Sequence, residues 1–362
     1  MEERYVVIMA GGRGERFWPQ SRLRRPKHLL PIVGDAPMLV QTVERLKGLV
    51  PPENIFVVTN REQREAVLES CPDLPPEHVV GEPVGRDTAA AVGLSALLVK
   101  RENPSAAFAM LPADHVIADA EGFRSVLVAA FAAASAEDLL VTIGIRPDEP
   151  ATGYGYLHRG EVRGEREGRT IYNVRRFVEK PDLKTAEGYL ASGEYLWNAG
   201  MFVWRPETIL RAIEVHAPDL AVGLVKLEKS WKEGGDLDSA MEIVYPTLTK
   251  ISVDFAVMEK ADNVAVLESA FDWDDVGEWP AIARHFQSDE GGNVFRGEGL
   301  AMEAKGNVVY AEDGHLVALL GVDDLIVVQS GDATLVCRKD MAQRIKELTR
   351  KVAEREGGER LV

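Results

Sequence analysis

The fold of this chain is decided by residues 10–19, which read AGGRGERFWP and directly follow the apolar run at residues 5–9. The glycines leave the main chain free to wrap an anion with its N–H groups, because glycine adopts conformations that a Cβ atom forbids. From Gly11 to His28 the chain carries six cations and one acid, although its formal net charge is −16. The cations are Arg13, Arg16, Arg22, Arg24, Arg25 and Lys27. This local reversal of charge predicts a phosphate site, and a nucleoside triphosphate is the expected anion.

The glycine spacing excludes two common phosphate-binding motifs. A P-loop needs Gly-x-x-x-x-Gly-Lys followed by Ser or Thr, and a dinucleotide fingerprint needs a third glycine where this chain has Phe17. Pro19, Pro26 and Pro31 prevent the segment from forming one long helix. We therefore expect the anion on an extended basic loop, followed by a first helix over residues 37–48.

On these residues the chain resembles the mannose-1-phosphate guanylyltransferases, a family of sugar-nucleotide pyrophosphorylases. The family pattern Gly-Gly-x-Gly-x-Arg-x-Trp-Pro-x-Ser-Arg, followed by Pro-Lys, is present over residues 11–27. The resemblance continues in the same order at EPVGRDTA (82–89), LPADH (111–115), GYGY (153–156), FVEKP (177–181), WNAGMF (197–202), SVDFAVMEK (252–260) and WDDVGEW (273–279). The chain departs from the family at His28-Leu29, where Gln-Phe is usual, and at Asp87, where Asn is usual.

The alternation of apolar and amphipathic stretches predicts an α/β fold with a mixed, mostly parallel sheet. Strands are expected at residues 5–9, 55–58, 78–80, 106–111 and 139–145. The basic loop, Glu82 and Asp114 each follow one of these strands, at the edge where open α/β sheets bind ligands. Two further strands between Gly153 and Lys180, separated by a polar turn over residues 159–170, are expected to form an insertion that lays a sugar-binding lid beside the nucleotide half.

The chain is expected to divide into residues 1–289, a Rossmann-like nucleotidyltransferase domain, and residues 290–362, a small β module with a terminal helix. The resemblance implies that this module is similar to a left-handed β-helix. Its helix carries an apolar stripe at Met341, Ile345, Leu348 and Val352. The stripe needs an apolar surface to cover it, so we expect a homodimer through the C-terminal region, with packing inside one subunit as the alternative.

Composition excludes several classes of partner. A pI near 5.0 argues against a nucleic-acid or anionic membrane surface. The two cysteines, Cys71 and Cys337, have no zinc-type spacing. The charged start Glu2-Glu3-Arg4 and the short apolar run behind it do not form a signal peptide or a membrane span. We therefore expect a cytoplasmic enzyme that acts on small molecules.

The expected chemistry needs charge neutralisation rather than a protein nucleophile. A sugar 1-phosphate oxygen attacks the α-phosphorus of the nucleotide, and positioning and electrostatics supply the catalysis. Mg²⁺ suits this role, because it uses one or two carboxylates and lets substrate phosphates complete its shell. The resemblance assigns the metal to Asp114 and Asp275, although each could instead serve in a turn or a cap. Asp274 is expected to cap a helix that begins at Glu278 or to support the metal ligands, and the seven histidines are expected to be structural or surface residues.

The resemblance also assigns the substrate contacts. Arg16 and Lys27 bind the triphosphate, unless they are only paired surface cations, and Lys180 binds the sugar phosphate, unless it is an exposed charge after a strand. Glu82 can accept both N1–H and N2–H of guanine, and its structural alternative is an acid at a helix N-terminus. The remaining nucleotide contacts are Gly11, Gly12, Arg13, Gly14, Gly85, Arg86 and Thr88. The remaining sugar contacts are Gly153, Glu179, Asn198 and Gly200.

The resemblance therefore implies an enzyme that makes GDP-mannose and pyrophosphate from GTP and α-D-mannose 1-phosphate. One alternative is the same chemistry with another nucleotide or with a glucose or heptose phosphate. Another is a non-catalytic subunit that senses sugar nucleotides. Such a subunit is expected to have lost Lys27, Asp114 or Asp275, and all three are present.

Overall fold

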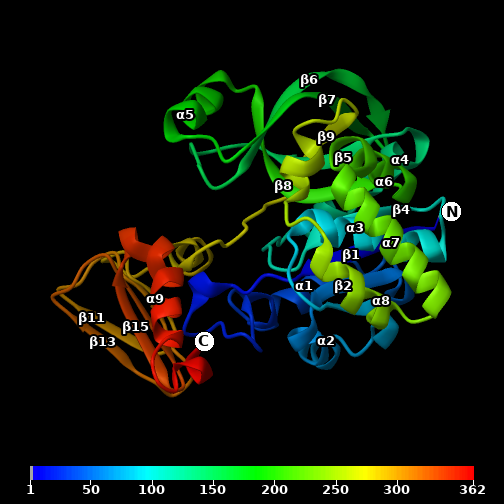
Figure 1. Ribbon diagram of the computed structural model, residues 1–362. Coiled ribbons are helices and arrows are strands. Elements are labelled where there is room, and N and C mark those ends of the chain that lie inside the picture. The colour runs from blue at the N-terminus through cyan, green and yellow to red at the C-terminus, as the bar shows by residue number, and fades with distance from the viewer. Residues whose placement is uncertain (1–2) are drawn as a thin grey trace.

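The strand that precedes the basic loop lies inside a nine-stranded sheet. In the computed structural model, which describes residues 3–362 and so leaves Glu2 outside, this sheet has the order β3-β2-β1-β4-β8-β5-β9-β7-β6 (Figure 1). Its strands are β1 (Arg4–Ala10), β2 (Ile55–Asn60), β3 (Val79–Glu82), β4 (Ala107–Pro112), β5 (Leu140–Ile145), β6 (Gly155–Arg166), β7 (Arg169–Glu179), β8 (Tyr195–Trp204) and β9 (Val264–Glu268). Strands β1 to β4 pair in parallel, whereas β8 pairs antiparallel with β4 and β5. The five strands expected first and the mixed α/β sheet are confirmed.

Helices cover both faces of the sheet because successive strand residues point to opposite sides. In β1, Tyr5 and Val7 pack with helices α3, α6, α7 and α8, while Val6 and Ile8 pack with α1, α2 and α4. The helices are α1 (Met38–Arg45), α2 (Arg64–Ser70), α3 (Thr88–Glu102), α4 (Ala120–Ala136), α5 (Leu183–Ser192), α6 (Pro206–His216), α7 (Pro218–Gly234), α8 (Leu237–Val244) and α9 (Ile345–Ala353). The first helix lies within the expected range, and short 3-10 turns occupy the loop before it at Glu15–Phe17 and Lys27–Leu29.

The segment 159–170 is not the expected polar turn. It continues β6 and begins β7, and the turn is reduced to Glu167 and Gly168, which both have positive φ. Charged side chains alternate along β6 at Arg159, Glu161, Arg163 and Glu165, and none of these residues is buried. An antiparallel edge can keep one face in water, and for this reason a charged stretch forms strand there. The hairpin therefore extends the main sheet instead of forming a separate inserted lid.

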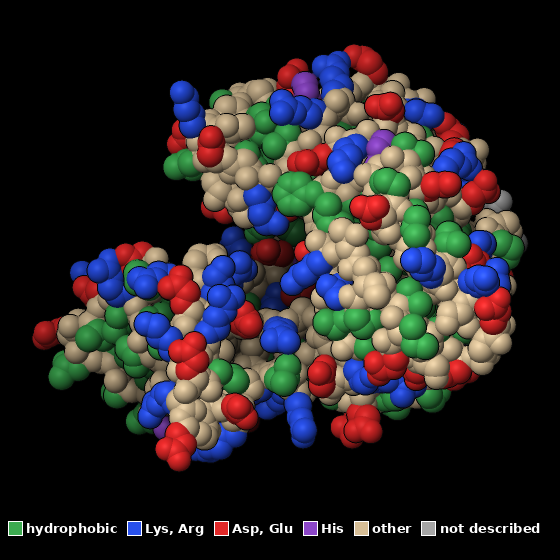
Figure 2. All heavy atoms as spheres, viewed as in Figure 1, with side chains coloured by type: hydrophobic (Ala, Val, Ile, Leu, Met, Phe, Trp, Pro, Cys, Tyr) green, Lys and Arg blue, Asp and Glu red, His purple; other side chains and the backbone are tan. Residues whose placement is uncertain are grey.

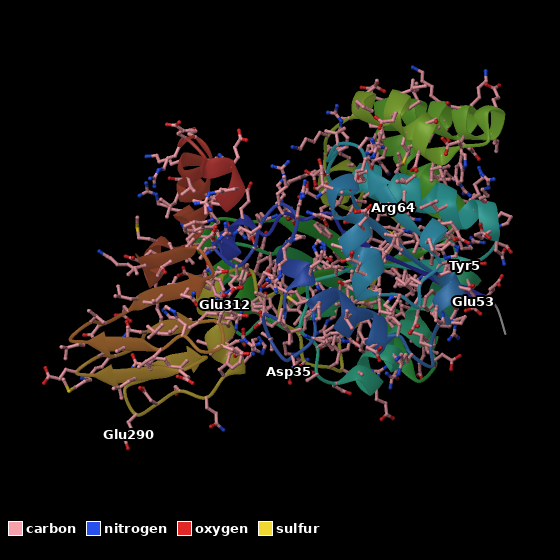
Figure 3. The ribbon with its side chains drawn as sticks, turned by 90° about the horizontal axis from the view of Figure 1, so that it is seen from below. Tyr5, Asp35, Glu53, Arg64, Glu290 and Glu312 are labelled. Atoms are coloured by element: carbon pink, nitrogen blue, oxygen red, sulfur yellow. The ribbon has the colours of Figure 1, made fainter. Side chains whose placement is uncertain are left out.

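The C-terminal strands form a small module beside the main sheet (Figure 3). They are β10 (Val294–Arg296), β11 (Gly299–Met302), β12 (Val308–Tyr310), β13 (Val317–Leu320), β14 (Leu325–Ser330) and β15 (Ala333–Arg338). Strands β10, β12 and β14 are parallel neighbours, and β11 pairs in parallel with β13. This arrangement of parallel layers agrees with the β-helix-like module expected from the resemblance.

The module shares a hydrophobic core with the basic loop. Phe17 and Trp18 of the loop pack with Trp279 and with Ile345 of α9. Helix α9 therefore lies between the module and the loop (Figure 1), and part of its apolar stripe is covered by its own chain. Leu348 of the stripe stays 42 % exposed. Within residues 3–362, no helix is long and apolar enough to cross a membrane.

Candidate active site

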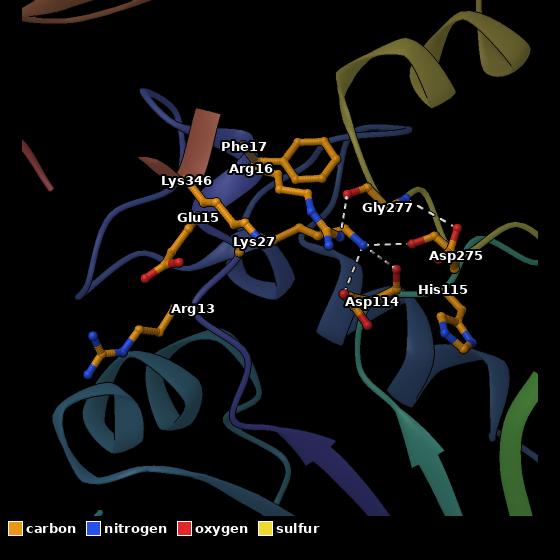
Figure 4. Close-up of a pocket in the computed structure, with 11 residues that line it drawn as sticks. Arg13, Glu15, Arg16, Phe17, Lys27, Asp114, His115, Asp275, Gly277 and Lys346 are labelled. Carbon is orange, nitrogen blue, oxygen red and sulfur yellow. Dashed lines mark hydrogen bonds and ion pairs between the residues drawn. The ribbon is translucent and has the colours of Figure 1, made fainter. Parts of the chain in front are cut away.

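The basic loop and the ends of several strands meet in one cavity of about 480 Å³. It is lined by Arg13, Gly14, Glu15, Arg16, Phe17, Lys27, Asp114, His115, Asp275, Gly277 and Lys346 (Figure 4). A deep cleft opens between the module and the main sheet, and Lys and Arg side chains gather along its walls (Figure 2). The predicted phosphate and metal residues Arg13, Gly14, Arg16, Lys27, Asp114 and Asp275 are thus brought together from three distant parts of the chain.

The conformation of the loop depends on Gly14. Its φ is 63°, and a Cβ atom there would lie 2.6 Å from Cβ of Lys27. Its carbonyl accepts hydrogen bonds from Phe17 N at 2.8 Å and from Ser21 Oγ at 2.6 Å. A side chain at position 14 would push the loop away from Lys27, so the glycine sets the close approach of these two segments.

Lys27 joins the two aspartates. Its Nζ donates to Asp114 Oδ2 at 2.8 Å, to the Asp114 carbonyl at 3.1 Å and to the Asp275 carbonyl at 2.7 Å. Lys27 is only 5 % exposed, whereas the Asp114 side chain is 39 % exposed. Burial acts to raise the pKa of Asp114, but the charge and the hydrogen bond of Lys27, together with smaller contributions from His115 and His28, outweigh it and lower that pKa to about 2. The Asp114 carboxylate is therefore ionised and able to bind a cation.

Asp275 is oriented by its neighbours. Its Oδ1 accepts hydrogen bonds from Tyr154 OH at 2.9 Å and from Gly277 N at 3.2 Å. Arg16 reaches the same segment, with its guanidinium 3.5 Å from the Gly277 carbonyl. These contacts fix one carboxylate oxygen at the wall of the cavity.

The neighbouring aspartates have structural roles. Asp274 is buried, accepts a hydrogen bond from Val276 N at 2.8 Å and contacts Arg284 and His285. The Asp272 carboxylate accepts hydrogen bonds from the backbone N–H groups of Ala118 and Asp119, both at 2.8 Å. The supporting role expected for Asp274 agrees with this geometry, but a 3-10 helix (Trp279–His285) replaces the α-helix that it was expected to cap.

Asp114 and Asp275, two of the three carboxylates that line the cavity, fit a magnesium ion. Mg²⁺ needs only one or two protein carboxylates when phosphates complete its coordination. Across residues 3–362 there is no cluster of three or more His, Cys, Asp or Glu side chains that could hold a metal by itself. The ammonium of Lys27 already places positive charge beside Asp114 and Asp275.

His28 and His115, the histidines near the site, are not placed to bind a metal ion together with the aspartates. His115 accepts a hydrogen bond at Nδ1 from Trp273 Nε1 at 3.1 Å, with the tautomer set by this contact. His28, one of the departures from the family pattern, is buried, and burial lowers its pKa to about 4. His28 is therefore neutral at physiological pH and adds no charge to the loop.

A second cavity, of about 400 Å³, is lined by several residues expected to contact the nucleotide. Its lining includes Gly11, Gly12, Glu82, Gly85 and Thr88 from the predicted set, with Gly200 from the predicted sugar contacts. Asp87 and Asp254 also line it, and neither was assigned a ligand contact from the sequence.

Glu82 ends strand β3 and is only 6 % exposed. It accepts a hydrogen bond from Tyr245 OH at one carboxylate oxygen. Burial raises the pKa of Glu82 to about 7, although the Tyr245 hydrogen bond acts in the opposite direction. Its other oxygen lies 3.1 Å from the position that a Cβ on Gly11 would take, so the glycine keeps space open beside the carboxylate.

Asn198 on β8 connects the sugar motif to Asp254. Its Oδ1 accepts from Thr142 Oγ1 at 2.9 Å and from Gly200 N at 3.2 Å, and its Nδ2 donates to Asp254 Oδ1 at 3.2 Å. Burial raises the pKa of Asp254 to about 7. Asp254 lies inside the motif at residues 252–260, so the sequence contained a signal for it.

Other predicted contacts lie outside the two cavities. Lys180 is exposed, has a φ of 48° and pairs with the carboxylate of Glu179. Arg86 donates to the carbonyl of Pro246, and a Cβ on Gly153 would meet no atom within 4 Å. The roles of these residues stay predictions.

Three residues were missed in the sequence because their contacts are long-range. Tyr154 lies 121 positions from Asp275, and Tyr245 lies 163 positions from Glu82. Lys346 reaches the first cavity from α9; this cavity is called the phosphate cavity below, after the ligand predicted for it. The residue type of Tyr154 and its place in the GYGY motif were visible in the sequence, but nothing local pointed to Tyr245 or Lys346.

Comparison with known proteins gives consistent results. The family model described as Nucleotidyl transferase matches residues 5–291, and that of a MannoseP isomerase/GMP-like beta-helix domain matches residues 297–352. The chain is 39 % identical to a mannose-1-phosphate guanylyltransferase of Escherichia coli K12 over 352 residues, which cover 96 % of this chain and 73 % of that protein. It is 38 % identical to the mannose-1-phosphate guanylyltransferase ManC of Salmonella typhimurium, with the same two coverages.

A solved structure agrees with these sequence matches. It comes from Thermus thermophilus and is described as a "mannose-1-phosphate geranyltransferase". It has 40 % sequence identity and a TM-score of 0.83, and the match covers 96 % of this chain and 99 % of that one.

Proposed function

Because the chain belongs to the nucleotidyl transferase family and, within it, to the mannose-1-phosphate guanylyltransferases, we propose that it makes GDP-mannose and pyrophosphate from GTP and α-D-mannose 1-phosphate. The observation that carries this proposal is the contact of Lys27 with both Asp114 and Asp275 inside the cavity of the basic loop. It supports the proposal because two aspartates and several cations lie in one cavity, and the meeting of two phosphate-bearing substrates needs such charges.

The residues of the phosphate cavity supply positioning and charge. Asp114 and Asp275 would hold Mg²⁺, which when bound neutralises phosphate charge and aligns the two substrates. Arg16 and Lys27 hold the triphosphate so that its α-phosphorus faces the sugar phosphate, with the pyrophosphate opposite. Arg13 and the backbone of Gly14 complete the contacts in this cavity, and the backbone of Gly11 and Gly12, which line the second cavity, is proposed to contact the nucleotide there.

The base is read in the second cavity. Ionised Glu82 accepts N1–H and N2–H of guanine together, which adenine cannot offer on its corresponding edge. Tyr245 holds one oxygen of this carboxylate in place. Gly85, Arg86 and Thr88 are proposed to contact the base or the ribose.

The sugar phosphate is proposed to bind beside the β6–β7 hairpin. Lys180 neutralises its phosphate, and Glu179 and Asn198 contact sugar hydroxyls. Gly153 and Gly200 allow the sugar to approach the main chain closely.

We also propose that the chain divides at residue 289 into the nucleotidyltransferase domain and the C-terminal module. Its further partner is a second copy of the chain, bound through the C-terminal region, and the reaction takes place in the cytoplasm. Nucleic acids and membranes are not among the proposed partners.

A substrate panel tests the proposed function. Four nucleoside triphosphates are combined with the 1-phosphates of mannose, glucose and a heptose, and pyrophosphate release is measured with and without Mg²⁺. The highest kcat/KM is expected for GTP with mannose 1-phosphate. A higher value for another pair would establish the alternative substrates, and the absence of turnover with every pair would favour a sensing subunit.

A further inference from the structure

The phosphate cavity receives one cation from outside the basic loop. Lys346 lies in the first turn of α9 and lines the cavity with Arg13 and Arg16. Figure 4 shows its side chain extending from the helix toward the loop. Lys346 is partly buried, whereas the adjacent Glu347 is exposed. Glu347 pairs with Arg344, and Lys346 forms no ion pair with any residue from 3 to 362.

The position of this helix is fixed on both sides of Lys346. On one side, Gln343 Nε2 donates to Glu278 Oε2 at 2.7 Å, next to the segment that carries Asp275. On the other side, the Leu361 carbonyl accepts from Trp18 Nε1 at 2.6 Å. Ile345, which is 2 % exposed, packs in the core that contains Trp18. These contacts hold the start of α9 at the rim of the phosphate cavity.

Two other cations of the cavity, Arg16 and Lys27, are partly engaged by protein oxygens. The ammonium of Lys27 is surrounded by Asp114 and the Asp275 carbonyl, and Glu15 adds a negative charge to the lining. A nucleoside triphosphate brings several negative charges, and its β- and γ-phosphates gain charge when they leave as pyrophosphate. An unpaired ammonium at the rim would bind those phosphates as a mobile point charge.

We propose that Lys346 binds the β- and γ-phosphates of the nucleoside triphosphate, so that the C-terminal module contributes a substrate-binding residue to the phosphate cavity. This assignment rests on the proposed function, because it takes the triphosphate as the ligand of the cavity. It extends that function by giving the module a direct part in binding the leaving group. The same residue binds free pyrophosphate when the reaction runs backward.

The test compares Lys346→Met in the full-length chain with a matched control, Lys351→Met. Lys351 is an exposed lysine of the same helix that does not line the phosphate cavity. Lys346→Met is expected to raise KM for GTP in the forward reaction and KM for pyrophosphate in the reverse reaction, each by about tenfold, as the loss of one charged contact predicts. KM for mannose 1-phosphate and KM for GDP-mannose should stay unchanged. Lys346→Arg should recover most of the loss, and Lys351→Met should behave as wild type.

An unchanged KM for pyrophosphate in folded Lys346→Met would overturn the assignment, as would an effect on the sugar phosphate alone. If Lys346→Met does not fold, judged from its thermal unfolding, the same comparison is made with Lys346→Gln. Calorimetric titration with magnesium pyrophosphate separates this assignment from the proposed function. Wild type should bind it about tenfold more tightly than Lys346→Met even if no substrate pair is turned over, and equal affinities would refute the role of Lys346.

Discussion

The ammonium group of Lys27 lies 2.8 Å from Oδ2 of Asp114, although 87 positions separate the two residues in the chain. The same ammonium donates to the Asp275 carbonyl at 2.7 Å, 248 positions away. One buried lysine therefore connects the basic loop with both segments that carry the proposed metal ligands. Because the three groups are in contact, a change at any of them is expected to affect the chemical step.

Asp114→Asn and Asp275→Asn are each expected to lower kcat at least ~100-fold at saturating substrate, because each removes a carboxylate that balances charge in the transition state. Steady-state kinetics over a range of Mg²⁺ concentrations checks this. Asp272→Asn is the control, since Asp272 holds only the backbone of Ala118 and Asp119. Near-normal turnover of either variant at high Mg²⁺ would remove that residue from the metal site.

Lys27→Met is expected to lower kcat by about 100-fold or more and to raise KM for GTP, because it removes a preorganised charge from the phosphate cavity. Arg24→Met is a suitable control, since Arg24 belongs to the same loop but is exposed and does not line the cavity. Single-turnover measurements separate the chemical step from binding. A change confined to KM for the sugar phosphate would mean that Lys27 serves the other substrate.

Glu82 should make GTP binding depend on pH. Its pKa is about 7 because the side chain is buried, and its protonated form cannot accept two hydrogen bonds from guanine. The affinity for GTP is therefore expected to fall as the pH is lowered from 8 to 6. Glu82→Gln should lose this dependence and most of the preference for GTP over ATP, whereas Glu77→Gln, an exposed acid just before the same strand, should keep both. Equilibrium binding of GTP at several pH values checks this. The same pH dependence of affinity in wild type and Glu82→Gln would contradict the role of Glu82.

The same pKa predicts an effect on stability. A carboxyl group whose pKa is raised in the folded state contributes stability below its unfolded pKa of 4.5 and loses it as the pH rises through about 7. Relative to wild type, Glu82→Gln should therefore increase the free energy of unfolding more at pH 8 than at pH 5, by about 2 kcal/mol. Urea unfolding at both pH values measures this difference. An equal effect at both pH values would show that Glu82 does not titrate in this range.

Truncation after Asp289 is expected to cause aggregation and loss of activity. The module covers Phe17, Trp18 and Trp279, all of which are buried in the full chain, and its removal would expose them. Size-exclusion chromatography and thermal unfolding of the truncated chain check this. A soluble, active chain that ends at residue 289 would show that the module is dispensable for the phosphate cavity.

The expected homodimer has a candidate surface on the module. Leu300 and Met302 on β11 and Leu320 on β13 are each 58–64 % exposed, and Met302 and Leu320 are paired neighbours. Light scattering of the full-length chain should give a dimer at micromolar concentration, and Leu300→Lys with Leu320→Lys should give a monomer with normal turnover. A monomeric wild-type chain would mean that the apolar stripe of α9 packs only within its own subunit. The burial of Ile345 in a core of its own chain agrees with this alternative.

The sequence by itself determined those parts of the protein that depend on local pattern. The loop at residues 10–19 predicted a phosphate site because its glycines and cations lie next to one another. Apolar runs predicted β1 to β5. Asp114 comes just after β4, and it became a candidate because ligands of open α/β sheets bind at strand ends. The polar alternation at residues 159–170 was misread as a turn, because an exposed edge strand and a polar loop have similar composition.

Only the tertiary structure decided which distant side chains meet. The contact of Tyr245 with Glu82 and the arrival of Lys346 at the phosphate cavity depend on how helices and the module pack, which no local spacing records. Burial is likewise a property of the packed molecule. Glu82 has a pKa near 7 because the surrounding core removes it from water, and an isolated Glu82 in the unfolded chain would titrate near 4.5.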